Sequence, residues 1–422
     1  MGKYPKTIEV LYALKDRSGS YSKLVGTSIC SMLERTGEKV RVHIFHDGSI
    51  SEENKEKFGQ IAEKYRQEIL FYNVRKLLAE VWEEAYRILP RAITDSRYTE
   101  ATLYRLLAPQ VLPEVERLIY LDADTVVNID IRSLWQEHIG PSGMAAVREV
   151  DLIEYLGLQL KRVVYAKTLD DMAVNGVTRE GYFNAGVLLM DLARMRKMGN
   201  LLIEGFKMLT KISSETNFYD QNILNYFFAK DLTPLPCQYN LLQYWDNMRP
   251  DSEVKEGIYH FSSRSLGLDP RDERNVLHWE AFLKTPWADG RFFCRFNHEL
   301  KLMYQNAGTA RFEKMRSMLA AWGNKRLVIA YEDKFKEKLD KLFPPDACYC
   351  HLGSKESLNL HFDYDVDSHF YLLFVSEYPR VSAICTKAGL QEGVHYLDGD
   401  MFLEDRLWAN DLITIQQFYE SL

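Results

Sequence analysis

The sequence has no long apolar run and no regular cysteine pattern. None of its 422 residues falls in a stretch approaching the ~18 consecutive apolar residues of a membrane-spanning helix. The six cysteines are scattered, and only Cys348 and Cys350 lie close together, which excludes a disulfide framework and a zinc-ligand spacing. The polar residues 1–6 predict no signal peptide. We therefore expect a protein of the reducing cytoplasm.

The sequence also lacks the Gly-x-Gly-x-x-Gly turn of dinucleotide-binding domains. That turn would follow the predicted strands at 7–14 and 327–331, but residues 15–20 and 332–335 do not contain it. A pyrophosphate needs those glycines for close approach to the backbone. We therefore expect no NAD site at either place. A net charge of −7 likewise argues against nucleic acid as a partner.

The charge changes sharply along the chain. Residues 327–422 hold 8 Lys/Arg and 17 Asp/Glu, a net charge of −9, and because the whole chain carries −7, residues 1–326 carry +2. The 46% hydrophobic and 27% charged content is that of a globular protein. A chain of this length accommodates two or three domains. We expect a domain boundary near residue 326.

The first third of the chain alternates between strands and helices. Apolar residues predict strands at 7–14, 40–45 and 69–74, and a helical face runs from Leu24 to Leu33. Ser51 is a candidate N-cap of a second, charged helix. This order predicts a Rossmann-like α/β half with a mostly parallel sheet.

Two aspartates follow a further apolar run of the chain. Residues 118–121 predict a buried, parallel strand that runs into Asp122-Ala123-Asp124. Side chains at i and i+2 of an extended chain point the same way, so Asp122 and Asp124 can present four oxygens to one point. That edge of an open α/β sheet is where ligands bind. The pair therefore indicates Mg²⁺ or Mn²⁺ carrying a phosphate, whereas the simpler interpretation is a strand end with two solvated aspartates.

Two chemistries use such a pair. In nucleotide-sugar glycosyltransferases an Asp-x-Asp holds a metal on a diphosphate. In haloacid-dehalogenase-type phosphatases the first aspartate, here Asp122, attacks phosphate and the second, Asp124, acts as the acid. The phosphatases also need a later lysine and an acidic pair, for which residues 167–171 are a poor candidate.

Four further segments carry polar residues beside apolar runs. Each also has a structural interpretation: a surface arginine for Arg105, turn chemistry before a strand for Asn184, a helix N-cap for Asp220, and a structural histidine for His260. The segments are a helix over 99–108, a Gly-containing turn at 181–186, a helix opening at 218–225 and a short strand over 257–262. Residues 148–180 lack a clear pattern and predict a loop over the site.

Taken in order, these segments resemble glycosyltransferase family 8, the galactosyl- and glucosyltransferases of bacterial surface glycans and of glycogenin. The resemblance covers roughly residues 7–290. Its landmarks are Tyr104-Arg105-Leu106, Leu121-Asp122-Ala123-Asp124, Tyr182-Phe183-Asn184-Ala185-Gly186, Asp220-Gln221 and His260-Phe261. It implies a single Rossmann-like catalytic domain of the GT-A type, with a mixed, mostly parallel sheet, over residues 1–290.

The resemblance also implies roles for individual residues. It assigns Mn²⁺, or Mg²⁺, to Asp122, Asp124 and His260, and chemistry at the transferred sugar to Asp220 and Gln221. It assigns contacts with the nucleotide sugar to Ala13, Tyr21, Arg105, Ala123, Asn184, Ala185 and Arg264.

Two segments depart from the family pattern. The acidic pair expected after the first strand is replaced by a longer turn over 15–21, in which Tyr21 aligns best and Asp16 is the acidic residue. The lysine expected after the metal histidine is missing, and Arg264 or Arg271 is its candidate substitute. The resemblance implies a retaining hexosyltransferase that moves glucose or galactose from a UDP-hexose to a glycan or lipid-linked glycan, as in lipopolysaccharide synthesis. The alternative is a weakly active sugar-nucleotide-binding scaffold.

The remainder forms two further segments. Residues 291–326 hold 8 Lys/Arg against 2 Asp/Glu, with interleaved aromatics. This is either a linker helix packed on the first domain or a contact with anionic lipid at the inner membrane face. Residues 327–422 resemble the small Rossmann-like accessory domains of bacterial sugar-modifying enzymes, with predicted strands at 327–331 and 371–376.

Overall fold

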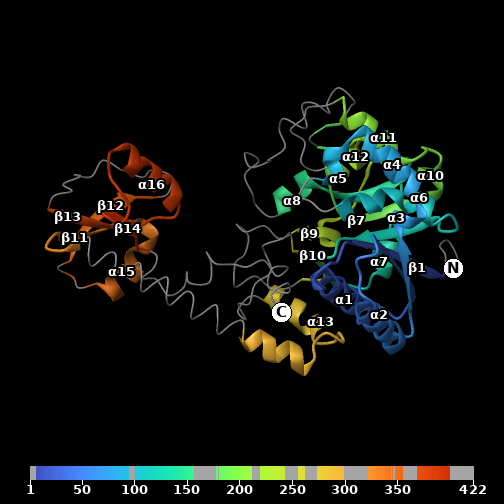
Figure 1. Ribbon diagram of the computed structural model, residues 1–422, viewed down its shortest axis with the longest axis horizontal. Coiled ribbons are helices and arrows are strands. Elements are labelled where there is room, and N and C mark those ends of the chain that lie inside the picture. Colours follow the sequence, from blue (N-terminus) through green and yellow to red (C-terminus); the bar gives the residue numbers. More distant parts are fainter. Residues whose placement is uncertain are drawn as a thin grey trace. The chain divides into compact units, whose positions relative to one another are not determined.

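The computed structural model divides the chain into two compact units, of which the first reaches Phe293 and the second begins at Cys294 (Figure 1). It describes residues 6–94, 100–155, 177–178, 180–211, 219–242, 255–261, 273–298, 322–343, 345, 347–354 and 368–399. Arg264, Arg271 and the 167–171 segment lie outside these ranges. The domain limits proposed from the charge shift remain a proposal.

A seven-stranded sheet of order β3-β2-β1-β4-β7-β6-β8 forms the centre of the first unit. The first four strands in that order are mutually parallel, while β7 runs antiparallel to both β4 and β6. Strand β1 is buried along almost its whole length, as expected for a parallel strand covered on both faces. The bounds are β1 Thr7–Leu14, β2 Lys39–His46, β3 Glu68–Asn73, β4 Arg117–Leu121, β6 Met144–Arg148, β7 Phe183–Asp191 and β8 Thr233–Pro234. The predicted α/β class with a mixed, mostly parallel sheet is confirmed.

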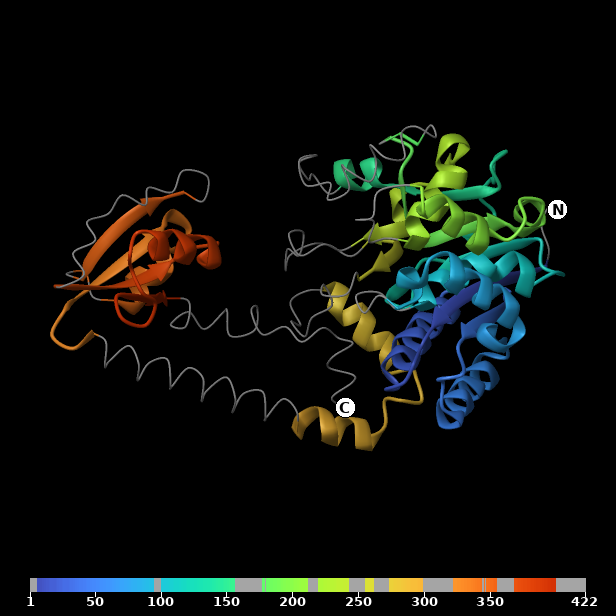
Figure 2. The ribbon, with the colours of Figure 1, turned by 45° about the horizontal axis from the view of Figure 1, so that its top comes forward.

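Helices cover both faces of this sheet, and Figures 1 and 2 show α1, α2 and α13 on one face and α4, α11 and α12 on the other. Successive side chains of β1 point to opposite faces of the sheet. The Tyr12 hydroxyl is hydrogen-bonded to the Ser28 hydroxyl of α1, whereas Leu11 packs in the core beneath α11 and α12. The helices are α1 Ser20–Leu33, α2 Glu52–Tyr65, α3 Val74–Leu77, α4 Ala79–Ile88, α5 Pro90–Thr94, α6 Ala108–Val111, α7 Arg132–Trp135, α8 Glu149–Tyr155, α10 Leu192–Arg196, α11 Leu201–Leu209, α12 Tyr219–Phe228 and α13 Glu273–Phe282, with 3₁₀ segments Glu100–Leu107, Ala229–Asp231 and Cys237–Asn240.

Side-chain caps fix where the first two helices begin. Ser51 accepts a hydrogen bond from the Asn54 amide, so the predicted N-cap of α2 is confirmed. Asp16 caps α1 from further upstream, because its carboxylate accepts from the amides of Tyr21 (3.1 Å) and Ser22 (3.0 Å). Asp16 is only 2% exposed, and its carboxylate is committed to this helix start.

A small second sheet follows the aspartate pair. Strand β5, Thr125–Asn128, pairs antiparallel with β10, Gly257–His260, which pairs in parallel with β9, Leu241–Leu242. The apolar run around the aspartates is thus two strands in different sheets, with Asp122 and Asp124 in the turn between β4 and β5. The register places His260 opposite Thr125.

Three local predictions are wrong in whole or in part. Asn184, Ala185 and Gly186 lie inside strand β7 rather than in a turn before it, because the Gly186 carbonyl accepts from the amide of Asp122, just after β4, and the Ala185 amide donates to Gln221 of α12. The segment predicted as one helix over 99–108 is mainly 3₁₀ and turns α-helical only at Ala108. Part of the predicted loop over 148–180 is helix α8.

The second unit holds a parallel four-stranded sheet of order β12-β11-β13-β14. Its strands are β11 Arg326–Glu332, β12 Cys348–Gly353, β13 His369–Phe374 and β14 Tyr396–Asp398, with a 3₁₀ segment at Asp333–Phe335 and helices α15 Lys336–Leu342 and α16 Tyr378–Lys387. Glu332, 1% exposed, accepts a hydrogen bond from the Ser376 amide at the carboxyl ends of β11 and β13. Its carboxylate therefore fills the place where doubly wound sheets bind anions.

The basic segment 291–326 is described at its two ends. Phe292 packs on Phe282 of α13 with ring centroids 4.6 Å apart, and Phe293 is 41% exposed. Among the described residues, no helix has the length and apolar character needed to cross a membrane.

Candidate active site

The carboxyl end of β4 gathers two carboxylates and an imidazole, which we call the carboxylate–histidine cluster: Asp122, Asp124 and His260. One ligand atom from each lies within 4.8 Å of the others. His260 Nε2 is 3.3 Å from Asp124 Oδ1 and 3.6 Å from Asp122 Oδ2. The β5–β10 register creates this arrangement, because it brings the end of β10 beside the turn that carries the aspartates.

Gly186 makes room for the cluster. Its carbonyl accepts a hydrogen bond from the Asp122 amide at 2.8 Å, which holds β7 against the turn. A Cβ at Gly186 would lie 2.1 Å from His260 Cε1 and 3.0 Å from Asp122 Oδ2. Only glycine fits there without displacing the imidazole.

Burial and charge act in opposite directions on His260. Burial lowers its pKa, but the neighbouring carboxylates of Asp124 and Asp122 outweigh burial, so the pKa is raised overall. A divalent cation meets the same need for positive charge between two carboxylates. Two carboxylate oxygens and one imidazole nitrogen form a donor set that suits a divalent cation. The residues present therefore fit a divalent metal ion.

Arg105 lies under the cluster rather than on the surface. It is 3% exposed, so the surface interpretation is wrong. Its guanidinium donates to Asp122 Oδ1 (2.7 Å) and to the carbonyl of Ala185 (2.5 Å), and lies 3.3 Å from Asp220 Oδ2. Burial lowers the pKa of Arg105, but Asp122 and Asp220 raise it above its usual value. Arg105 thus remains a fixed positive charge between two carboxylates.

The two oxygens of Asp122 have separate partners. Oδ1 accepts from Arg105 and from the Tyr120 hydroxyl, both at 2.7 Å. Oδ2 faces His260. The carboxylate is therefore oriented by one oxygen and presented to a ligand by the other.

Gln221 is held at both ends of its amide. Its Oε1 accepts from the Ala185 amide at 3.1 Å, and its Nε2 donates to Glu149 Oε1 and to the Tyr182 hydroxyl, both at 3.2 Å. Asp220, beside it, is 8% exposed; burial raises its pKa, and Arg105 partly offsets that rise.

Glu149 is a site residue that the sequence interpretation missed. It is 7% exposed, and burial raises its pKa to about 7, against the lowering effect of Gln221. Glu149 directly follows strand β6, just as Asp122 directly follows β4. Ligands bind at the carboxyl ends of such strands, so this position was a signal that could have identified Glu149. Asn240 was missed as well, and no signal in the sequence distinguished it.

The other predicted residues lie at the same edge of the sheet. Ala13 is near the carboxyl end of β1, Tyr21 is in the first turn of α1, and Ala123 separates the aspartates. Parallel strands β1 and β4 end side by side, which brings these positions to one edge. Hydrogen bonds and ion pairs join eight of the predicted residues, Arg105, Asp122, Asp124, Asn184, Ala185, Asp220, Gln221 and His260. Ala13 and Tyr21 are related to these residues by the sheet edge, and Arg264 lies outside the described residues.

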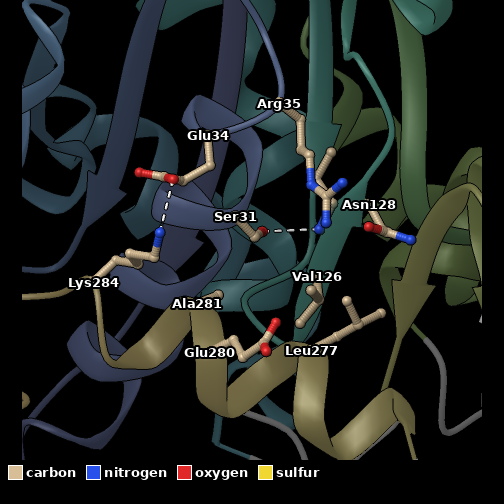
Figure 3. A pocket seen from close by; sticks show the side chains of 10 residues that line it. Ser31, Glu34, Arg35, Val126, Asn128, Leu277, Glu280, Ala281 and Lys284 are labelled. Carbon is tan, nitrogen blue, oxygen red and sulfur yellow. Dashed lines mark hydrogen bonds and ion pairs between the residues drawn. The ribbon is translucent and has the colours of Figure 1, made fainter.

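A separate pocket of about 240 Å³ lies between α1, β5 and α13 (Figure 3). Arg35 and Asn128 reach into it from one side and Glu280 of α13 from the other, and the ion pair between Glu34 and Lys284, 2.9 Å apart, lies at its wall. No residue of the carboxylate–histidine cluster lines it, so it is not part of this site.

Comparison with known proteins identifies relatives of the first unit. General stress protein A of Bacillus subtilis (strain 168) is 26% identical over 192 residues, covering 45% of this chain and 58% of that protein. The lipopolysaccharide 1,2-glucosyltransferase of Escherichia coli (strain K12) is 28% identical over 247 residues, covering 56% of this chain and 63% of its own length. The chain thus spans less than two thirds of these relatives.

Among solved structures, the WbbM bifunctional glycosyltransferase in its apo form superposes with a TM-score of 0.50 and 17% identity, covering 68% of this chain and 51% of that chain. This similarity concerns the fold alone. The family description "Glycosyl transferase family 8" matches residues 14–290. Of the two chemistries that use an Asp-x-Asp pair, the match favours glycosyl transfer over phosphate hydrolysis. The chain belongs to glycosyl transferase family 8.

Proposed function

We propose that the chain is a retaining hexosyltransferase that moves glucose or galactose from a UDP-hexose to a glycan or lipid-linked glycan acceptor, with Mn²⁺ or Mg²⁺ as cofactor. The observation that carries this proposal is the carboxylate–histidine cluster at the carboxyl end of β4. A relative whose name describes a lipopolysaccharide glucosyltransferase supports a surface glycan as acceptor.

Asp122, Asp124 and His260 would hold the cation. When bound, a divalent cation supplies positive charge that offsets the negative charge building on the leaving diphosphate. Arg105 keeps the Asp122 carboxylate turned toward that position through its 2.7 Å hydrogen bond. Its buried charge adds to the positive field without reorganisation during the reaction.

Asp220 and Gln221 would serve the transferred sugar, together with Asn184 and Ala185. In this proposal the Asp220 carboxylate stabilises positive charge developing at the anomeric carbon. Retention of configuration requires the acceptor to attack from the face of the leaving group, or an intermediate of short lifetime. The departing phosphate takes the proton of the acceptor hydroxyl, and neither Asp220 nor Gln221 is assigned as a nucleophile.

Ala13, Tyr21 and Ala123 would contact the nucleotide, and Arg264 would take the place of the family's diphosphate-binding lysine. We further propose that the protein works in the cytoplasm and attaches peripherally to the inner membrane face through residues 291–326. The exposed side chain of Phe293 and the excess of basic residues in that segment support this attachment.

The test is a panel of UDP-sugars incubated with the protein and Mn²⁺, with slow release of UDP measured in the absence of acceptor. We expect one UDP-hexose to be hydrolysed, and chelation with EDTA to stop the reaction. Mn²⁺-dependent binding of UDP without turnover of any sugar would instead favour a sugar-nucleotide-binding scaffold.

A further inference from the structure

A chain of hydrogen-bonded side chains connects the two halves of the proposed site. His260 Nδ1 is 3.1 Å from Asn240 Oδ1, and Asn240 Nδ2 donates to Asn184 Oδ1 at 2.9 Å. Asn184 Nδ2 in turn faces Gln221 Oε1 at 3.4 Å. The chain therefore runs from a residue of the carboxylate–histidine cluster to the residues assigned to the sugar.

Two consecutive backbone amides of β7 fix the direction of this chain. The Gly186 amide donates to Asn184 at 2.9 Å, and the Ala185 amide donates to Gln221 at 3.1 Å. A backbone N–H is always a donor, so each atom it meets must be an oxygen. This assigns the amide orientation of Asn184 and Gln221 without reference to any other side chain.

The orientation of Asn240 follows from that of Asn184. Because the Asn184 oxygen is an acceptor, the Asn240 atom facing it must be the NH₂ group. The Asn240 oxygen then faces His260 Nδ1, which must carry a proton to donate to it. In the neutral imidazole the other nitrogen, Nε2, keeps its lone pair and faces Asp122 and Asp124.

We propose that Asn240 is a positioning residue that sets the tautomer of His260 and ties this histidine to the sugar side of the site. The proposal rests on the proposed function for the identity of the two ligands. Asn240 is fully buried, so water cannot replace either of its hydrogen bonds. Partners that orient a metal-bound histidine typically change metal affinity by about 10–100-fold when removed.

The link also predicts coupling between the two ligands. A cation held by His260 would make the Nδ1 proton more acidic and so strengthen its bond to Asn240, which would polarise the bond to Asn184 in turn. Binding of the cation and recognition of the sugar then favour each other, and by linkage the effect is reciprocal. UDP lacks the sugar, so its binding affinity should depend on the cation but not on the side chains that recognise the sugar.

Three variants separate the parts of the chain. Asn240→Ala removes both bonds. Asn240→Asp keeps an oxygen that accepts from His260 Nδ1 but cannot donate to Asn184. Asn128→Ala is the matched control, because Asn128 is a buried asparagine on β5 of the same small sheet whose NH₂ donates to the Lys255 carbonyl. Each variant is compared with wild type for Mn²⁺ affinity and for the ratio of UDP to UDP-hexose dissociation constants, by calorimetry.

We expect Asn240→Ala to lose about tenfold or more in Mn²⁺ affinity and to lose its preference for UDP-hexose over UDP. Asn240→Asp should keep Mn²⁺ affinity but lose that preference, and Asn128→Ala should keep both. Imidazole ¹⁵N shifts of the metal-free protein, measured at a pH high enough to make the imidazole neutral, should show the Nδ1-protonated tautomer in wild type and a mixture in Asn240→Ala.

The proposal is overturned if Asn240→Ala matches Asn128→Ala in Mn²⁺ affinity, ligand preference and imidazole shifts. A wild type that binds neither Mn²⁺ nor UDP would count against the proposed function instead. The imidazole shifts still decide the role of Asn240 in that case, because they are measured without either ligand.

Discussion

Replacing Gly186 by alanine tests whether the cluster depends on a backbone position that carries no ligand. The added Cβ would lie 2.1 Å from His260 Cε1 and 2.5 Å from Nδ1. Contacting carbon atoms prefer separations of about 3.5–4.0 Å, so the imidazole has to move by roughly 1.5 Å. Metal–ligand distances tolerate only about 0.2 Å. Gly186→Ala should therefore remove Mn²⁺ binding although all three ligands remain.

The same clash has a stability cost. Overpacking of a filled interior typically lowers the free energy of unfolding by about 1–3 kcal/mol. Gly59 provides the control, because it lies on the exposed side of α2 and an added Cβ meets no atom within 4 Å. Gly59→Ala should stabilise the protein by about 0.5–1 kcal/mol through the lower backbone entropy of alanine in a helix.

The assay combines denaturant unfolding, which gives the change in stability, with calorimetric titration of Mn²⁺. The expected result is loss of Mn²⁺ binding in Gly186→Ala, with a folded protein at the temperature of the titration, and unchanged binding in Gly59→Ala. Wild-type Mn²⁺ affinity in a folded Gly186→Ala protein would refute the reasoning, because His260 would then not need its present position.

Three further results are expected. Arg105→Met leaves the buried carboxylate of Asp220 unpaired and should lower the free energy of unfolding by about 3–5 kcal/mol. The control, Arg132→Met at an exposed ion pair, should change it by about 0–1 kcal/mol. Equal effects of the two variants in denaturant unfolding would contradict the role of Arg105. Burial raises the pKa of Glu149 from 4.5 to about 7, so its contribution to stability is complete below pH 4.5 and is lost as pH rises through about 7. Glu149→Gln should flatten the fall in melting temperature over that range, and an unchanged pH profile would be inconsistent with this. Vesicles of anionic lipid should co-sediment the protein at low salt but not at 1 M, where the Debye length is about 3 Å; equal binding to neutral vesicles, or none to either, would mean that residues 291–326 only pack on the first unit.

The sequence predicted the fold well because the hydrophobic pattern of a buried strand is a local property of the sequence. The apolar runs of β1, β2 and β4 have the length and pattern of buried strands, and their order is that of an α/β unit. It also predicted the aspartates, since residues at strand ends follow from that pattern. Strand β12 was missed because its polar and aromatic residues give no clear alternation, and β14 was missed because it has only three residues.

The errors at the site have a common physical cause. Asn184-Ala185-Gly186 has the composition of a turn, yet tertiary contacts hold it in a strand, where Gly186 serves the approach of His260. Glu149 was missed, and the surface interpretation of Arg105 is wrong, because the burial of a charged residue depends on partners distant in sequence. Asn240 acquires its position only through contacts with β7 and β10, which no local pattern encodes.

The most direct test of the central claim is the rate of UDP release from the preferred UDP-hexose as Mn²⁺ is increased, measured for wild type and Asp124→Asn. Asp130→Asn serves as the control, because Asp130 lies outside the cluster and faces Arg132 at 3.7 Å. The account predicts a saturable rise for wild type and Asp130→Asn and no rise for Asp124→Asn. A wild-type rate that is unaffected by chelation, or an Asp124→Asn protein that responds to Mn²⁺ as wild type does, would contradict it.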